Sequence, residues 1–147
     1  MLKEYELRQV INQLDWEAYH RIRRTELFER RGRVGVYNET HQDEHEANNQ
    51  PLLLLFEGRC IGTVRLDYVP PDLGIIRLFA IDGPVQRLGH GRNFLSLLES
   101  HAKSFGIATF EANSAPEAVG FWRQQSFEMI DEAREFPLLR RQMSYAL

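Results

Sequence analysis

The sequence predicts an α/β fold of the α+β type, in which a mixed, mostly antiparallel sheet of about six to seven strands carries helices on both faces. Three observations predict it. Short apolar or alternating runs typical of strands are interleaved with helical stripes, and turn residues separate them closely. The 147 residues, 43% of them hydrophobic, suffice for one core. We therefore expect a single domain over residues 1–147.

The N-terminal part predicts a strand followed by a helix. Residues 5–7 alternate apolar and charged side chains, which is typical of a short strand. Asn12 is a suitable N-cap for the next helix, and Gly32 offers its stop. The side chains expected on the buried face of this helix are Leu14, Ala18 and Ile22. The polar residues 38–50 then predict a loop or a short exposed helix.

Three consecutive strands are expected next. The apolar run at 51–56 is short enough for a buried strand, and the Glu-Gly-Arg sequence at 57–59 predicts a hairpin turn. Residues 60–68 alternate with a period of two, so one face of that strand is expected to be more polar. The prolines at 70–71 end it, and the apolar residues 74–81 form the third strand.

The last third predicts two helices and three strands. The helix after residue 91 ends at Gly106, a left-handed cap. Its apolar stripe comprises Phe94, Leu97, Leu98, Ala102 and Phe105. Residues 107–112 predict a strand, and 114–117 predict a capping box for a second helix. That helix carries Ala118, Phe121 and Trp122 inward. Residues 127–130 and 139–145 predict a final antiparallel pair.

The strand at 74–81 runs into a glycine-rich turn that a helix follows at once. The first N–H groups of a helix have no internal partner and carry the positive end of its dipole. Gly89 and Gly91 lack side chains, so their backbone can approach a ligand closely. The turn therefore predicts a cradle for phosphate oxygens, with a merely tight strand-to-helix turn as the alternative. The glycine spacing fits neither a P-loop nor a dinucleotide fingerprint.

This turn and its flanks resemble the GNAT superfamily of acetyltransferases. Residues 86–91, Gln-Arg-Leu-Gly-His-Gly, are similar to the family motif Q/R-x-x-G-x-G/A, at a similar distance from the preceding strand. Downstream, Asn113, the Phe-Trp pair at 121–122 and Phe127 resemble the family's strand-five asparagine and the aromatic helix that leads into its next strand. The likeness is strong over residues 60–131 and weaker over residues 22–28.

The resemblance implies an N-acetyltransferase that moves acetyl from acetyl-CoA, its co-substrate, to a primary amine by direct attack in a ternary complex. It implies that the turn binds the coenzyme pyrophosphate and that the preceding strand and Asn113 bind the pantetheine arm. Arg87 and Arg92 either add charge to the phosphates or are ordinary exposed arginines. The expected coenzyme-binding residues are Phe79, Ala80, Ile81, Gln86, Arg87, Leu88, Gly89, His90, Gly91, Arg92 and Asn113.

The family's usual catalytic pair is absent from this sequence. Many members place a glutamate base on the strand that corresponds to 74–81, which has no carboxylate here, and a tyrosine acid where Trp122 stands. Ser126 also replaces the usual glycine. The catalytic residues are therefore unassigned. Substitute bases are Glu26, Asp67, Tyr68, Asp72 and Glu111, each of which also reads as a surface or pairing residue. Positioning alone, with deprotonation left to solvent, is another route.

The missing pair keeps two other functions open. One is a non-catalytic module that binds CoA or acyl-CoA as a sensor or structural ligand. The other is an interaction protein whose glycine turn is only structural. The acceptor is also open among peptide N-termini, lysine side chains, polyamines, amino sugars and small amines. Members of the family are often dimers, so a homodimer is a further candidate state.

Composition narrows the remaining partners. A formal net charge of -3 gives no support for nucleic acid, and no apolar run approaches the ~20 residues of a membrane span. The single cysteine, Cys60, suits a reducing compartment, and the charged start of the chain lacks a signal peptide, so a cytoplasmic location is expected. His41 and His45 have metal-compatible spacing, but the ligand set is incomplete and no metal is expected. Their segment is also a candidate rim of the acceptor pocket.

Overall fold

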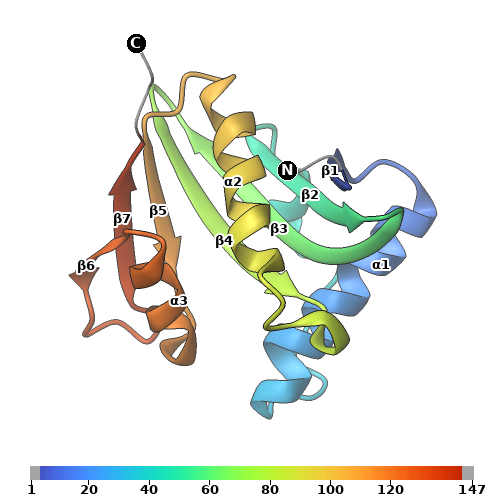
Figure 1. Cartoon of the computed structure of the whole chain (residues 1–147). Helices are drawn as coiled ribbons and strands as arrows, with labels where there is room; N and C mark the ends of the chain where they lie inside the picture. Colours follow the sequence, from blue (N-terminus) through green and yellow to red (C-terminus); the bar gives the residue numbers. More distant parts are fainter. Residues whose placement is uncertain (1–3, 144–147) are drawn as a thin grey trace.

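The structure, a computed structural model, describes residues 4–143 and is built on one seven-stranded sheet (Figure 1). The strands are β1 (Tyr5–Gln9), β2 (Asn49–Phe56), β3 (Arg59–Val69), β4 (Leu73–Ile81), β5 (Thr109–Asn113), β6 (Glu128–Asp131) and β7 (Leu138–Gln142). The α-helices are α1 (Gln13–Arg23), α2 (His90–Lys103) and α3 (Val119–Gln124). A π-helical turn lies at Arg24–Phe28. Short 3₁₀ helices lie at Glu29–Arg31, Gln42–His45, Gly83–Val85 and Pro116–Ala118.

The strand order in the sheet is β1-β2-β3-β4-β5-β7-β6. Only β4 and β5 run parallel, and every other neighbouring pair is antiparallel. The predicted mixed, mostly antiparallel sheet with helices on both faces is therefore confirmed. The last strand was expected over residues 139–145 but ends at Gln142, and Tyr145 lies outside the described residues.

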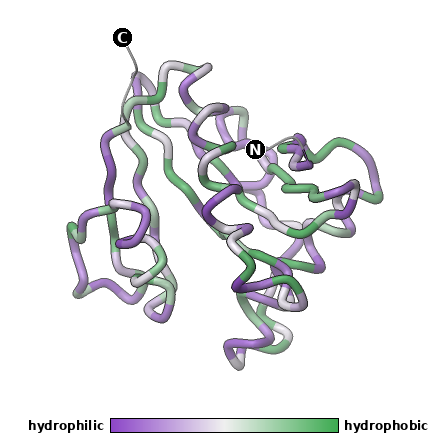
Figure 2. The backbone as a smooth tube through the Cα atoms, viewed as in Figure 1, coloured by the Kyte–Doolittle hydropathy of each residue, from purple (hydrophilic) through white to green (hydrophobic). Residues whose placement is uncertain are grey.

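The larger core lies between the sheet and α2. Phe94, Leu98 and Ala102 form the buried stripe of α2, and they pack against strand residues such as Leu66 and Ile76. Full burial of an aliphatic or aromatic side chain of this kind contributes about 1.5–3 kcal/mol. Figure 2 shows hydrophobic stretches along the central strands, whereas the segment after β6 is hydrophilic.

A smaller core lies on the opposite face, beneath α1. Tyr19 of α1 packs there with Val10, Leu53 and Leu55, and Cys60 lies at its edge. Burial raises the pKa of the Cys60 thiol, so it is held in its neutral form. Cys60 thus has the surroundings of a packing residue and not those of an activated nucleophile.

The predicted buried stripe of α1 is partly wrong. Ile22 is fully buried, but Leu14 is 76% exposed. The first turn is held by Asp15, whose carboxylate accepts hydrogen bonds from the Arg8 side chain at 2.8 Å and from the backbone N–H of Ile11 at 3.3 Å. These bonds direct Asp15 toward the sheet, so Leu14, the residue before it, faces solvent.

Two further local predictions are wrong. Phe105, assigned to the buried stripe of α2, is 48% exposed because α2 ends at Lys103 and Phe105 lies in the turn that follows. The capping box at 114–117 does not form: the Ser114 hydroxyl donates to the carbonyl of Ala115, and Glu117 pairs with Arg31. The Ser114 hydroxyl is directed to a carbonyl and not to the helix N–H groups, and the helical turn at Pro116–Ala118 starts without a side-chain cap.

His101 of α2 makes the stability of the fold dependent on pH. Burial lowers the pKa of His101, because the apolar surroundings disfavour the imidazolium. The unfolded chain, with a pKa of about 6.5, then binds the proton more tightly. Stability is therefore complete above about pH 6.5 and falls as the pH drops from there through the lower folded value. We expect urea titrations at pH 7.5, 6.0 and 5.0 to show this loss, and His101→Gln to reduce it. An unchanged pH dependence in that variant would contradict the assignment.

Candidate active site

The central feature of the site is a split in the sheet between β4 and β5. The two strands pair over only four residues each, and the ladder ends at Ile76 and Ala112, although β4 continues to Ile81. In Figure 1 the strands lie side by side at one end and separate toward the other. A cavity of about 1210 Å³ opens where they part. The edge of β4 over residues 77–81 therefore presents backbone N–H and C=O groups to the cavity instead of to a strand.

A β-bulge lies at the point where the strands part. The pairing of β3 with β4 shifts register between Thr63 and Arg65, and Leu78 on β4 has a positive φ of 54°. The bulge changes which face the next side chains take. Arg77 bonds to Asp67 on the α1 face, whereas Phe79 stacks on Phe94 of α2 on the other face. The cavity is thus bordered by charged side chains on the α1 face of the sheet and by aromatic side chains on the α2 face.

The turn between β4 and α2 has the geometry of an anion cradle. Arg87 and Gly89 both have positive φ values, 66° and 85°. The helix begins at His90 without any side-chain cap. Successive N–H groups in such a turn converge on one point, and the helix dipole adds positive potential there. The backbone of residues 87–92 is therefore suited to hold phosphate oxygens.

The cavity brings together most of the residues predicted to bind the coenzyme. Phe79, Ala80, Ile81, Gln86, Arg87, Gly89, His90, Gly91, Arg92 and Asn113 all line it. Leu88 does not, and its side chain is exposed to solvent. The His90 ring turns away from the turn, because its Nδ1 lies 2.7 Å from the hydroxyl of Tyr5. Only the backbone of His90 is left to face a ligand in the turn.

Glu26 connects the turn to the helical segment after α1. One carboxylate oxygen accepts from the backbone N–H of Gly83 at 2.7 Å, and the other accepts from Gln86 at 3.1 Å and from Arg30 at 2.9 Å. The Gln86 side chain also donates to the carbonyl of Ile81. Gln86 and Glu26 therefore fix the path of the turn, a long-range contact that the sequence does not reveal.

The other candidate bases lie outside the cavity. Asp67 is shared by two arginines, and Glu111 pairs with Arg140 at 2.7 Å. The Tyr68 hydroxyl donates to the carbonyl of Pro71, and Asp72 is exposed at the start of β4. Of the five candidates only Glu26 lines the cavity, and both its oxygens are occupied. The structure thus offers no free carboxylate in the position of the family's usual base within residues 4–143.

Trp122 is a packing residue of the cavity wall. It is 4% exposed and meets Phe79, Phe121 and Phe127 edge to face, with ring centroids 5.0–5.2 Å apart. After it, Ser126 adopts a positive φ of 69°, which explains why a glycine suits that position.

We expect Trp122→Phe to cost roughly 1–3 kcal/mol of stability, because a smaller ring leaves a gap among these aromatic contacts. Thiol release under saturating substrates should stay within a few-fold of the wild type, since indole holds no proton that it could give at neutral pH. Chemical denaturation and a thiol assay measure the two effects. A collapse of turnover in a folded variant would show that Trp122 shapes the reacting centre.

A buried ionic cluster borders the cavity on the α1 face, which sequence reasoning missed. Arg23, at the end of α1, pairs with Glu44. Arg65 of β3 makes a two-pronged contact with Asp67 at 2.7 and 2.9 Å, and Arg77 of β4 reaches the same carboxylate at 2.8 Å. The alternation of β3 predicted a polar face, but that face is buried beneath α1 and the turn at 42–45.

Tyr37 lies at the outer side of this cluster and also lines the cavity. Its hydroxyl is 2.5 Å from Nδ1 of His20, and its ring packs against Phe28. Burial raises the pKa of Tyr37 to about 12, so the phenol stays protonated at neutral pH. Tyr37, His41 and Glu44 line the cavity, and the interpretation of the segment around His41 and His45 as an acceptor rim stays a prediction.

The histidines of that segment do not gather a ligand set. His45 packs against Trp16, and Glu44 turns inward to the arginines. Over residues 4–143, no group of three or more His, Cys, Asp or Glu side chains is arranged to hold a metal ion. Within the same residues, no helix has the length and apolarity needed to cross a bilayer.

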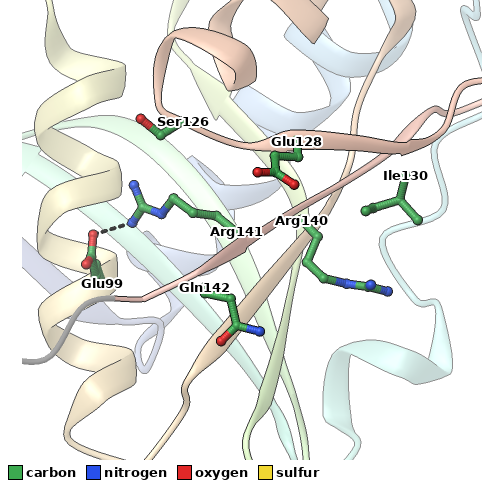
Figure 3. Close-up of a pocket in the computed structure, with 7 residues that line it drawn as sticks. All are labelled: Glu99, Ser126, Glu128, Ile130, Arg140, Arg141 and Gln142. Carbon is green, nitrogen blue, oxygen red and sulfur yellow. Dashed lines mark hydrogen bonds and ion pairs between the residues drawn. The ribbon is translucent and has the colours of Figure 1, made fainter.

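A second hollow, of about 560 Å³, lies beside α2, β6 and β7 (Figure 3). It contains none of the residues predicted to bind the coenzyme. Arg141 points toward Glu99 across one end of it, and the two side chains form an ion pair. The split in the sheet is therefore the better candidate site.

Comparison with known proteins agrees with this geometry. The model of the acetyltransferase (GNAT) family matches residues 10–127, whereas no curated protein matches the sequence. Among solved structures, a GNAT-family acetyltransferase from Staphylococcus aureus Mu50 superposes with a TM-score of 0.77 at 12% identity, covering 95% of this chain and 99% of that one. The ribosomal-protein-S18-alanine N-acetyltransferase from Escherichia coli gives 0.70 at 17%, with 97% and 96% covered.

A third similar structure is larger than this chain. N-acetylglutamate synthase from Neisseria gonorrhoeae, complexed with coenzyme A and N-acetyl-glutamate, gives a TM-score of 0.76 at 18% identity. The match covers 96% of this chain but 35% of that one. At such identities the superpositions establish the fold, and the family model, which spans most of the chain, establishes the lineage. The protein belongs to the GNAT acetyltransferase family and is an acyltransferase.

Proposed function

We propose that this protein transfers acetyl from acetyl-CoA to a primary amine by direct attack in a ternary complex. One observation carries the proposal: the unpaired edge of β4 and the amide cradle at the start of α2 border the same cavity. A molecule with an extended amide-containing arm and a pyrophosphate fits this pair of features. Coenzyme A, which is bound in the similar N-acetylglutamate synthase, has both parts.

In the proposed complex, the N–H groups of residues 87–92 hold the pyrophosphate at the positive end of α2. The pantetheine arm lies along residues 77–81 of β4 and exchanges backbone hydrogen bonds with them, as an added strand would. Asn113, at the end of β5, contacts the arm from the opposite side. Arg87 and Arg92 supply further positive charge at the rim.

The chemistry requires a neutral amine. A lysine-type amine has a reference pKa of about 10.4 and must lose a proton before its nitrogen attacks the thioester carbon. The new C–N bond forms, the C–S bond breaks, and the departing thiolate takes a proton from solvent. A backbone N–H near Ile81 is the proposed donor to the oxyanion. Because the described residues place no carboxylate at the position of the family's usual base on β4, we propose that water removes the proton from the amine.

We also propose that the protein acts in the cytoplasm. Its sequence holds one cysteine, Cys60, whose thiol is half-buried and free. A chain with a single cysteine cannot form an internal disulfide, which suits a reducing compartment.

Titration calorimetry with acetyl-CoA, followed by an amine panel with a thiol readout, tests the function. We expect saturable binding of acetyl-CoA, and thiol release that depends on both acceptor and enzyme and rises with pH as more amine is neutral. Binding without thiol release from any amine would instead support a coenzyme-binding module. A lack of binding would reject the site as well.

A further inference from the structure

The ionic cluster on the α1 face has an excess of positive charge. Arg65 and Arg77 are directly opposite one another in the β3–β4 ladder, a register at which like charges are destabilising unless they are compensated. Arg23 from α1 joins them near Glu44. Three guanidiniums thus share two carboxylates, Asp67 and Glu44.

Two of the three guanidiniums are buried, whereas the Arg77 side chain is 40% exposed. Arg23 is 2% exposed and Arg65 is 5% exposed. Nε of Arg23 has no hydrogen-bond partner among residues 4–143, and the nearest approach of Arg65 to Glu44 is 3.9 Å, which is too long for a hydrogen bond. Both buried guanidiniums are paired, Arg23 with Glu44 and Arg65 with Asp67, so the positive charge without a carboxylate of its own is that of Arg77, and an additional anion would compensate it.

The coenzyme phosphates do not meet this need. They are assigned to the start of α2, which packs on the opposite face of the sheet from α1. The bulge at Leu78 separates the two regions, with Arg77 directing its side chain to the α1 face. An anion at the arginines must therefore belong to a second molecule in the cavity.

The whole cavity shows the same imbalance. Eight arginines and four carboxylate residues line it, although the chain has a net charge of -3. Two carboxylates outside the lining, Asp67 and Glu135, pair with three of these arginines, so the lining alone overstates the excess. A polyamine would bring further positive charge toward these guanidiniums, which electrostatic repulsion disfavours.

We propose that the acceptor is a small amine that carries a carboxylate, namely a free amino acid, and that Arg23, Arg65 and Arg77 bind that carboxylate. This inference rests on the proposed acetyl transfer and names its substrate class. Arginine matches a carboxylate with two parallel hydrogen bonds, which fixes orientation as well as charge. Held in this way beside the bulge, the acceptor has its amine free to reach the thioester.

Matched pairs of acceptors test the proposal with the wild-type protein. Lysine and cadaverine differ by one carboxylate, as do ornithine and putrescine, and each common amino acid can be compared with its amide. We expect kcat/KM, read as thiol release, to favour the carboxylate by at least about tenfold. Dipeptides with an acidic first residue form a separate arm. A preference for them over free amino acids, or equal rates within the matched pairs, would overturn the proposal.

Variants locate the carboxylate site. Arg77 is 40% exposed at its side chain, so Arg77→Gln leaves the buried part of the cluster in place. We expect it to reduce the preference for the carboxylate by at least about tenfold, and Arg77→Lys to restore part of that preference. Arg59→Gln, an exposed arginine on the same strand as Arg65, is the control. An unaltered preference in Arg77→Gln and in Arg23→Gln would overturn the assignment.

A binding measurement separates this inference from the proposed function. Calorimetry with amino acids and their amides is carried out on the protein saturated with CoA, where no transfer occurs. Selective binding of a carboxylate supports the site even if no thiol is released with acetyl-CoA, a result that would reject the transfer alone. Acetylation of amines that lack a carboxylate, with no binding of any amino acid, would reject the inference and leave the proposed transfer intact.

Discussion

Gly89→Asp is expected to weaken acetyl-CoA binding by at least about 100-fold, which corresponds to roughly 2.7 kcal/mol. Gly89 adopts a φ of 85° and precedes the first residue of α2. An aspartate there adds a negative charge within a few ångströms of the proposed pyrophosphate position, where the repulsion between two charges at an effective dielectric of 20 is about 4 kcal/mol. It also competes for the N–H groups that would otherwise hold the phosphates.

Gly89→Asn is the matched control, because asparagine has the same shape, no charge, and a tolerance for the left-handed region. A side chain at this position meets nothing closer than Arg92 at 4.0 Å, so both variants have room to fold. Calorimetry with acetyl-CoA and thermal denaturation of the free protein measure affinity and folding separately. Equal affinities for the Asp and Asn variants would show that no anion binds at this turn.

Glu26→Ala is expected to destabilise the fold by about 2–4 kcal/mol and to raise the KM for acetyl-CoA. The substitution leaves the N–H of Gly83 and the amide of Gln86 without their acceptor, and Arg30 without its carboxylate. The turn then loses the contact that fixes its path next to the cradle. Denaturant titration gives the stability, and initial rates at varied acetyl-CoA give the KM.

Two control variants separate positioning from proton transfer at Glu26. Glu26→Gln keeps an acceptor for Gly83, so its kcat at saturating acetyl-CoA should stay near the wild-type value if Glu26 only holds the turn. Glu29→Ala, on the exposed surface nearby, should change neither stability nor KM. A loss of kcat in Glu26→Gln, with normal acetyl-CoA affinity and a flattened pH–rate profile, would instead identify Glu26 as the base.

Features that depend on neighbouring residues could be predicted from the sequence. The strand, glycine turn and helix over residues 74–105 are encoded by consecutive apolar runs and by Gly89, whose left-handed conformation suits few other residues. The hairpin at 57–59 and the left-handed Gly106 follow the same local rules. Placement of the proposed coenzyme residues around one cavity followed from these elements.

Features that depend on distant contacts could not be predicted. Glu26 and Gly83 are far apart in the sequence, and nothing in the segment around Glu26 marks it as a turn anchor. Thr63, Arg65 and Asp67 alternate as a solvent-facing strand face would, yet tertiary packing buries them. The orientation of α1 was also set by a tertiary bond, from Arg8 to Asp15, which a helical stripe does not contain.

The parallel pairing between β4 and β5 is short, so the stability of the fold depends on whether a ligand occupies the split beside it. Four residue pairs join the sheet's two halves there, so a pantetheine arm laid along the open edge would act as a borrowed strand. A ligand present at 100 times its dissociation constant adds about 2.7 kcal/mol to the native state. The melting temperature should therefore rise with the concentration of the coenzyme. In a cell depleted of acyl donor, the enzyme is expected to have its lowest thermal stability.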